Sequence, residues 1–328
     1  MERFSFKSLL IIIVVLLIGI VGLWQIQRRA KPAEAGWFNE SWQYRRSIGI
    51  SNPSGSNLTD FQVSVNIGTS ALIAAGKMKS DCSDIRFTDQ NGKLLDYWIE
   101  ENNPGCNQTT DTKIWVKLPS LPTSNATVYL YYGNPSAAAV QDGNKVFEFF
   151  DDFNDGNIDT NKWEMLKTDN TDASPYWSET GGYLLAAKTL GWPTYSTITS
   201  KNYTTQNGII ESRYTGTGSG DPDNDMLWVW RWQDYRNFYF FHHDWNNLDA
   251  KSCACLPSDN INFSKLINGS ETCLLYIGET AVDTEGTWYR NTIQFNSNTF
   301  TLNFTKNLSV GYSTIDSTFS SAGRVGLG

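Results

Sequence analysis

The chain begins with an unbroken apolar run and continues as short strands in which apolar and polar residues alternate. Residues 8–24 read SLLIIIVVLLIGIVGLW, close to the roughly 20 apolar residues that span a bilayer. We therefore expect an n-region at residues 1–7, a transmembrane anchor or uncleaved signal at residues 8–27, and a linker at residues 28–38. This pattern predicts a single-pass protein of the cell membrane with its body outside the cell, or a secreted protein if the N-terminus is cleaved.

Residues 39–146 predict an antiparallel β-sandwich. Apolar side chains alternate along Phe61–Ile67, Ile114–Leu118 and Val128–Tyr132, and Asn, Gly and Pro mark turns between them. Residues 70–79 favour a single helical turn.

Residues 147–328 predict a second all-β domain. The segment 244–280 interrupts the alternating pattern and is interpreted as a long insertion. Strands are expected at residues 183–186, 208–214, 226–233, 237–242, 288–295 and 299–304. The predicted fold class is therefore all-β, with two antiparallel β-sandwich domains after an N-terminal transmembrane helix.

Three tryptophans alternate along one predicted strand. In a regular strand, Trp228, Trp230 and Trp232 share one face and Arg231 lies on the other. Such a row is either a core ladder or a stacking platform for sugars, and the core interpretation is favoured. Exposed contacts to a glycan are expected instead near the following turn and strand, at Tyr235, Tyr239, His243 and Trp245.

Composition and charge limit the classes of partner that the protein is expected to bind. The net charge of −8 argues against nucleic acid and against an acidic membrane surface. Aromatic residues make up 14% of the chain, including 13 Trp, which suits both strand cores and stacking on sugar rings.

The cysteines and the glycosylation motifs both suit an oxidising exterior. Cys82 and Cys106 are expected to pair, whereas Cys253, Cys255 and Cys273 allow one further disulfide and leave one thiol. A zinc site is the alternative, and it would need His242 or His243 as a ligand. The candidate N-glycosylation sites, each in an Asn-x-Ser/Thr motif, are Asn57, Asn107, Asn125, Asn202 and Asn303.

One acidic turn has the spacing of a cation site. Asp221, Asp223 and Asp225 place three carboxylates at alternate positions, which suits calcium. A solvated turn capped by Asp side chains accounts for the same pattern. No other cofactor is predicted.

The sequence offers no catalytic constellation. Glycosidases place two carboxyl groups about 5 to 10 Å apart across a cleft. The strand at residues 226–232 carries no acid, and Glu211 and Asp234 stand alone. The chain is therefore predicted not to be an enzyme.

Five motifs in the first half carry a family resemblance. They are WQYRR at 42–46, SDCSDIRFTD at 80–89, YWIE at 97–100, KIWVKLP at 113–119 and YYGNP at 131–135. In this order they resemble a domain of unknown function that recurs in prokaryotic, often archaeal, surface proteins. The resemblance implies a surface β-domain without established chemistry.

The second half resembles a fold pattern. FFDDF at 149–153, WRWQD at 230–234 and GRVGLG at 323–328 resemble concanavalin-A-like, laminin-G-like jelly rolls. This fold is shared by glycan-binding modules and glycanases, so it implies little about activity. In such domains a further strand pairs with the first, so the domain at 147–328 is expected to lack its last strand.

Together these patterns predict a non-catalytic, membrane-anchored surface protein for adhesion or glycan recognition. Its partners would be polysaccharides or the glycans of glycoproteins. One alternative is a structural component of a surface assembly, in which an open sheet edge accepts a neighbour's strand. Another is a fragment of a polysaccharide-active enzyme.

Overall fold

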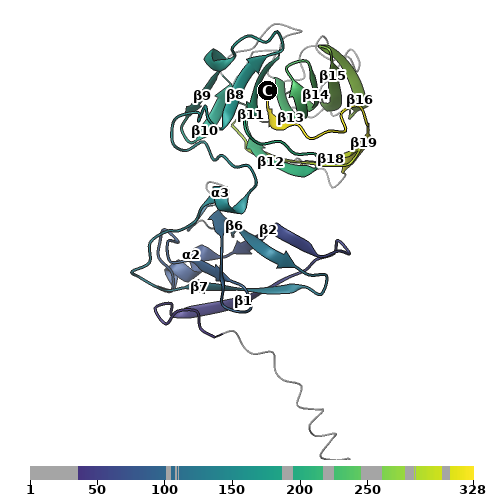
Figure 1. The fold of residues 1–328 in the computed structure, drawn as a ribbon. Helices are drawn as coiled ribbons and strands as arrows, with labels where there is room; N and C mark the ends of the chain where they lie inside the picture. Colours follow the sequence, from purple (N-terminus) through teal and green to yellow (C-terminus); the bar gives the residue numbers. More distant parts are fainter. Residues whose placement is uncertain are drawn as a thin grey trace, which may run out of the picture. The chain divides into compact units, whose positions relative to one another are not determined.

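The computed structural model describes residues 36–100, 105–107, 109, 111–186, 195–216, 225–244, 261–277, 284, 286–304 and 311–328. It confirms the all-β prediction, because antiparallel strands form every sheet in these ranges. The chain divides into two compact units, unit 1 at Met1–Asp151 and unit 2 at Asp152–Gly328 (Figure 1).

The helices that the structure describes do not support the predicted membrane localisation. In the described part of the chain, no helix is long and apolar enough to cross a bilayer. The longest there, α2 (Thr69–Ala74), has 6 residues and so spans about 9 Å, against about 30 Å of hydrocarbon. The span predicted at residues 8–27 lies outside the described residues, and the structure gives the anchor no support.

Unit 1 is a sandwich of two small sheets. One sheet has the order β1 (Tyr44–Ile50), β7 (Ala126–Tyr132), β3 (Arg86–Thr88), β4 (Leu94–Leu95). The other has the order β2 (Leu58–Ile67), β6 (Thr112–Leu121), β5 (Tyr97–Ile99). Alternate residues of β6 and β7, among them Ile114, Val116 and Leu130, meet in the buried core. A second short helix, α3 (Gly143–Val146), follows the last strand.

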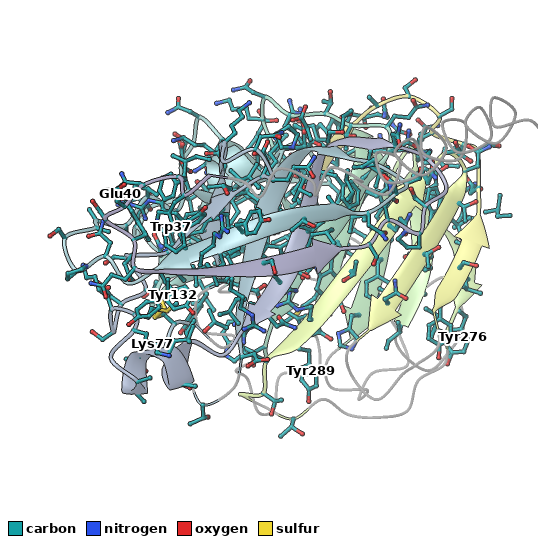
Figure 2. The ribbon with its side chains drawn as sticks, turned by 90° about the horizontal axis from the view of Figure 1, so that it is seen from below. Trp37, Glu40, Lys77, Tyr132, Tyr276 and Tyr289 are labelled. Carbon is teal, nitrogen blue, oxygen red and sulfur yellow. A yellow bond between two sulfur atoms is a disulfide. The ribbon has the colours of Figure 1, made fainter. Side chains whose placement is uncertain are left out.

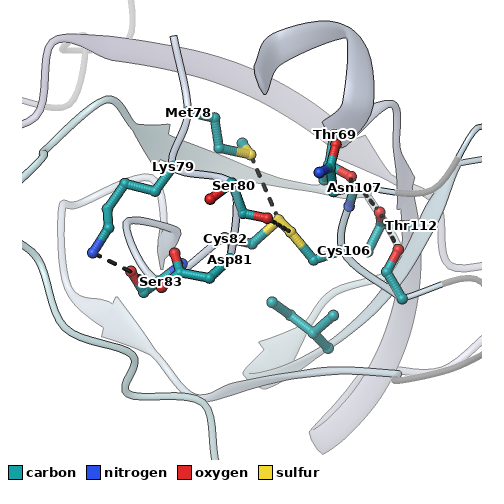
Figure 3. Close-up of a disulfide and its surroundings, with 12 residues drawn as sticks. Thr69, Met78, Lys79, Ser80, Asp81, Cys82, Ser83, Cys106, Asn107 and Thr112 are labelled. Atoms are coloured by element: carbon teal, nitrogen blue, oxygen red, sulfur yellow. Dashed lines mark hydrogen bonds and ion pairs between the residues drawn. A yellow bond between two sulfur atoms is a disulfide. The ribbon is translucent and has the colours of Figure 1, made fainter. Parts of the chain in front are cut away.

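A disulfide fastens the loop beside α2. Cys82 and Cys106 are bonded as predicted, with Cα atoms 6.0 Å apart (Figure 3). Closing a loop of this length stabilises a fold by about 3 kcal/mol in the chain-entropy account. Cys273 is also disulfide-bonded, whereas Cys253 and Cys255 lie outside the described residues.

The segment expected to start the second domain packs on unit 1 instead. The ring of Phe150 lies 4.8 Å from that of Trp98, and Phe147 lies 5.4 Å from Trp115. Residues 149–153 form no strand, so the resemblance of this segment to a first jelly-roll strand is not realised.

Unit 2 is a larger sandwich. Its seven-stranded sheet has the order β16 (Ser270–Tyr276), β15 (Ile261–Ile267), β14 (Asn237–Asp244), β13 (Asp225–Asp234), β20 (Arg324–Leu327), β11 (Ser196–Ser200), β8 (Trp163–Lys167). Its four-stranded sheet has the order β12 (Gly208–Tyr214), β17 (Tyr289–Asn296), β18 (Thr299–Phe304), β19 (Tyr312–Ile315). A hairpin of β9 (Trp177–Thr180) and β10 (Tyr183–Ala186) follows the 3₁₀ turn η1 (Ser174–Tyr176).

A β-bulge in β13 places the tryptophans of this strand on different faces of the sheet. Arg231 has φ 47°, and the register against β14 and β20 shifts around it. Trp228 and Trp230 face the four-stranded sheet, where Trp230 packs on Phe295 and Phe300. The extra residue turns Trp232 to the opposite face, among Leu227 and Val229. All three tryptophans are buried, as the core interpretation holds, but the prediction that they share one face is wrong.

Arg231 itself lies inside the sandwich, on the side of Trp230, where its guanidinium carbon is 5.5 Å from the ring centroid of Phe300. Its guanidinium donates to the carbonyl oxygens of Gln206 (2.9 Å), Phe319 (2.8 Å) and Ser297. Burial lowers the pKa of this guanidinium from its ordinary value. The backbone of Arg231 also demands glycine opposite, because a Cβ on Gly323 would come within 2.4 Å of the Arg231 carbonyl carbon.

The predicted insertion at 244–280 contains two strands of the main sheet. β15 and β16 pair as a hairpin whose turn is Asn268-Gly269, with φ 51° and 84°. Asn-Gly favours such turns because both positions need positive φ. At the other side of the sheet, β20 lies between β13 and β11, so both its edges are paired.

Replacing Arg231 by lysine is expected to destabilise unit 2 by about 3 kcal/mol, because an ammonium cannot reach three carbonyl oxygens and leaves some unpaired. Denaturant unfolding measures this change. The control is Arg236→Lys, at an exposed arginine in the next turn. Equal losses of stability in the two variants would contradict the role given to Arg231.

Candidate functional site

The outer face of the four-stranded sheet of unit 2 is open. Ile209 on β12 is 56% exposed and Ile315 on β19 is 73% exposed. The same face carries Arg290, Thr292 and Gln294 of β17, because alternate residues of a strand point to the same side.

Two aromatic rings stand at one end of this face. Trp288, immediately before β17, is 42% exposed, and Tyr183 at the start of β10 is 37% exposed. Their ring centroids are 5.9 Å apart and their planes cross at 65°. The next residue, Tyr289, pairs in register with Tyr214 and packs on its ring, with centroids 5.8 Å apart. Trp288 is thus held at the surface by the strand alternation that sends Tyr289 inward.

An arginine completes the cluster. The guanidinium carbon of Arg213, on the outer face of β12, lies 5.0 Å from the ring centroid of Trp288. Arg290, the register partner of Arg213 on β17, forms an ion pair with Glu211 on the outer face of the same sheet. We call Trp288, Arg213 and Tyr183 the Trp288 platform. It offers a half-exposed aromatic ring with a guanidinium over it.

The structure places the predicted glycan contacts elsewhere. Tyr239 and His243 lie on the inner face of β14, with exposures of 0% and 3%, so they are corrected to core residues. Tyr235 is half-buried and packs beside Trp232 and Phe238, and Trp245 lies outside the described residues. The sequence pattern does not reveal the Trp288 platform, because it places Trp288 inside the expected strand at residues 288–295.

Tyr239 belongs to a buried network that fastens the segment before β20. Its hydroxyl donates to Asp316 Oδ1 (2.5 Å), and Lys265 Nζ donates to Asp316 Oδ2 (2.6 Å). Burial raises the pKa of Asp316, but hydrogen bonds from Lys265, Tyr239 and Thr318 outweigh it and lower this pKa to about 2. Burial, with the hydrogen bond to Asp316, raises the pKa of Tyr239 to about 12.

The histidines do not form a joint metal site. His242 and His243 are neighbours on β14 and point to opposite faces of the sheet. His242 Nδ1 is 3.0 Å from Asn262 Oδ1 on the adjacent strand. Among the residues whose placement is described, no three His, Cys, Asp or Glu side chains gather as metal ligands.

The calcium site stays a prediction. Asp221 and Asp223 lie outside the described residues, and only the backbone of Asp225 is described, at the start of β13 opposite Asp244.

The five glycosylation candidates, Asn57, Asn107, Asn125, Asn202 and Asn303, are all exposed. Asn262 also starts an Asn-x-Ser motif but is 0% exposed, and its Nδ2 donates to Ser264 Oγ at 2.6 Å. That asparagine is a structural side chain.

The two isolated acids come from different sheets. Glu211 pairs with Arg290, and Asp234 accepts from Asn237 Nδ2 at the β13–β14 turn. A groove of about 410 Å³ in unit 1, lined by residues 46–50 and 64–67, contains no aromatic ring and no carboxylate. The absence of catalysis stays a prediction.

Residues 81–166 match a family described as a domain of unknown function (DUF2341). This confirms the resemblance of the first half to such a domain. The match covers the part of unit 1 from the loop before β3 and reaches β8 of unit 2. No curated protein matches the chain.

Two solved structures show weak likeness. One is the carbohydrate-binding module CBM66 from Bacillus subtilis, at 20% identity over 40% of this chain and 71% of that one, with a TM-score of 0.32. The other is LamAcat from Zobellia galactanivorans, at 14% identity over 54% of this chain and 83% of that one, with a TM-score of 0.29. At these values no residue of either protein can be placed on this chain.

The stability that Asp316 provides should disappear in acid. A carboxyl whose pKa is about 2 in the fold and 3.8 in the unfolded chain stabilises fully above about pH 5 and loses this contribution as the pH falls towards 2. Asp316→Asn should therefore lower the melting temperature by about 5 °C at pH 6, and by less at pH 2.5. Melting curves across this range test it, with Glu40→Gln as the exposed control. A difference that does not shrink in acid would contradict the network.

Proposed function

We propose that this protein recognises polysaccharides and that the Trp288 platform is its contact surface in unit 2. The observation that carries the proposal is a tryptophan ring, 42% exposed and fixed between Arg213 and Tyr183. Sugar rings present apolar C–H faces and rims of hydroxyls. A half-exposed ring with a guanidinium over it matches both parts, because the exposed part of the ring packs on the C–H face and the guanidinium N–H groups donate to hydroxyls.

A neutral polysaccharide fits the electrostatics. The chain carries a net charge of −8, which disfavours an anionic polymer at long range. Of the three side chains in the Trp288 platform, only Arg213 is charged, and none is a carboxylate. A polymer of neutral sugars is therefore the expected ligand class.

The second candidate function is assembly through strand pairing. β1 and β2 are both edge strands, and the groove in unit 1 runs between them. Light scattering separates the two functions, since assembly requires oligomers without sugar and recognition does not.

Trp288→Ala should weaken binding to a neutral polysaccharide at least about tenfold, which corresponds to 1.4 kcal/mol. Affinity electrophoresis of the full chain in soluble β-glucan, mannan and xylan measures this, with alginate as the anionic comparison. The matched control is Tyr276→Ala, which removes another aromatic ring of unit 2 with 37% exposure.

Retardation of the parent protein and of Tyr276→Ala, but not of Trp288→Ala, supports the proposal. A folded parent protein that no neutral polysaccharide retards contradicts it. The same gels run with calcium and with chelator show whether the Asp221–Asp225 segment contributes to binding.

A further inference from the structure

Unit 1 carries its own half-exposed tryptophan. Trp37 is 43% exposed and precedes β1, and its Nε1 donates to the backbone oxygen of Trp42 at 2.8 Å. Glu40, also exposed, lies three residues further along (Figure 2). The indole is therefore oriented by a hydrogen bond while much of its surface remains accessible.

The side chains around Trp37 repeat the chemistry of the Trp288 platform. The guanidinium carbon of Arg45 lies 5.3 Å from the Trp37 ring centroid and 4.6 Å from that of Tyr129. Tyr131 meets Trp37 edge to face, with centroids 5.5 Å apart and planes at 88°. In both units, therefore, an exposed tryptophan has an arginine over its ring and a tyrosine at its edge.

The arginines of the two clusters occupy similar places in their sheets. Arg45 is on β1 and Arg213 is on β12, and each strand is the edge of a four-stranded sheet. Arg45 pairs in register with Tyr131, whose ring lies on the outer face with Trp42 and Ala137. Tyr131 is fully buried, so it positions Trp37 and leaves ligand contact to Trp37 and Arg45.

We propose that Trp37 and Arg45, supported by Tyr131, form a second polysaccharide-binding site, which we call the Trp37 platform. It rests on the function proposed for the Trp288 platform and assigns a ligand class to unit 1. Each platform covers a small area and should bind a short oligosaccharide weakly. A polymer that occupies both sites is held more tightly, since binding at the second site becomes intramolecular.

The test compares polymer and oligosaccharide binding by the full chain. Its variants are Trp37→Ala, Trp37→Met, Trp288→Ala and the double variant Trp37→Ala/Trp288→Ala. Trp37→Met keeps apolar bulk without a flat ring, in case the alanine variant does not fold. The matched control is Phe61→Ala, an exposed aromatic of unit 1 outside the platform. The probes are β-glucan, mannan and xylan, with their tetrasaccharides.

The expected result is a loss of about tenfold or more in polymer affinity for each single variant, with a larger loss in the double variant. The parent protein should also bind polymer more tightly than tetrasaccharide. If both Trp37 variants bind like Phe61→Ala while Trp288→Ala is impaired, the second site is overturned and the proposed function stands. If the folded parent protein binds none of the probes, both proposals fall.

Discussion

Unit 2 depends on one buried guanidinium. Arg231 lies within the row of three tryptophans in β13 and donates hydrogen bonds to three backbone carbonyls from separate segments, at Gln206, Ser297 and Phe319. Those carbonyls belong to the segment before β12, the β17–β18 turn and the segment before β20, so the side chain joins both sheets. A buried charge without such partners would cost several kcal/mol, and the geometry around it is correspondingly constrained. The close approach of Gly323 is part of that constraint.

The bulge at Arg231 also determines on which face of the seven-stranded sheet Trp232 packs. By changing the side of the sheet on which Trp232 lies, it gives the seven-stranded sheet a buried apolar cluster on each face. All three tryptophans of β13 are buried and serve in packing. Two half-exposed rings lie outside the strands, Trp288 directly before β17 and Trp37 in the segment before β1, and an arginine lies over each of them. A rigid scaffold with aromatic rings fixed at its margins suits recognition of a polymer surface.

The sequence predicts the strands well where alternation or turn chemistry is strong. The expected strands at 237–242 and 299–304 correspond to β14 and β18, and the burial of the tryptophan row follows from its aromatic density. The hairpin of β15 and β16 is predictable from Asn268-Gly269, but the interrupted alternation over residues 244–280 favours an insertion instead. The bulge was not predictable, because its energy comes from carbonyls about 25 to 90 residues away that local pattern does not reveal. Tyr239 and His243 point inward because odd-numbered residues of β14 face the core, and the sequence does not show which alternate set does so. Trp288 is exposed although β17 begins at the very next residue, and a sequence pattern does not locate a strand end to one residue.

The most direct test of the account is a sugar titration followed through the tryptophan indole N–H signals by NMR. The chain has 13 Trp, and Trp288→Phe assigns the signal that matters. On adding a tetrasaccharide of the polysaccharide that retards the protein, the Trp288 signal should shift saturably while those of Trp228, Trp230 and Trp232 stay in place. A sugar that binds without moving the Trp288 signal, or that moves only the buried tryptophans, would contradict the proposed contact surface.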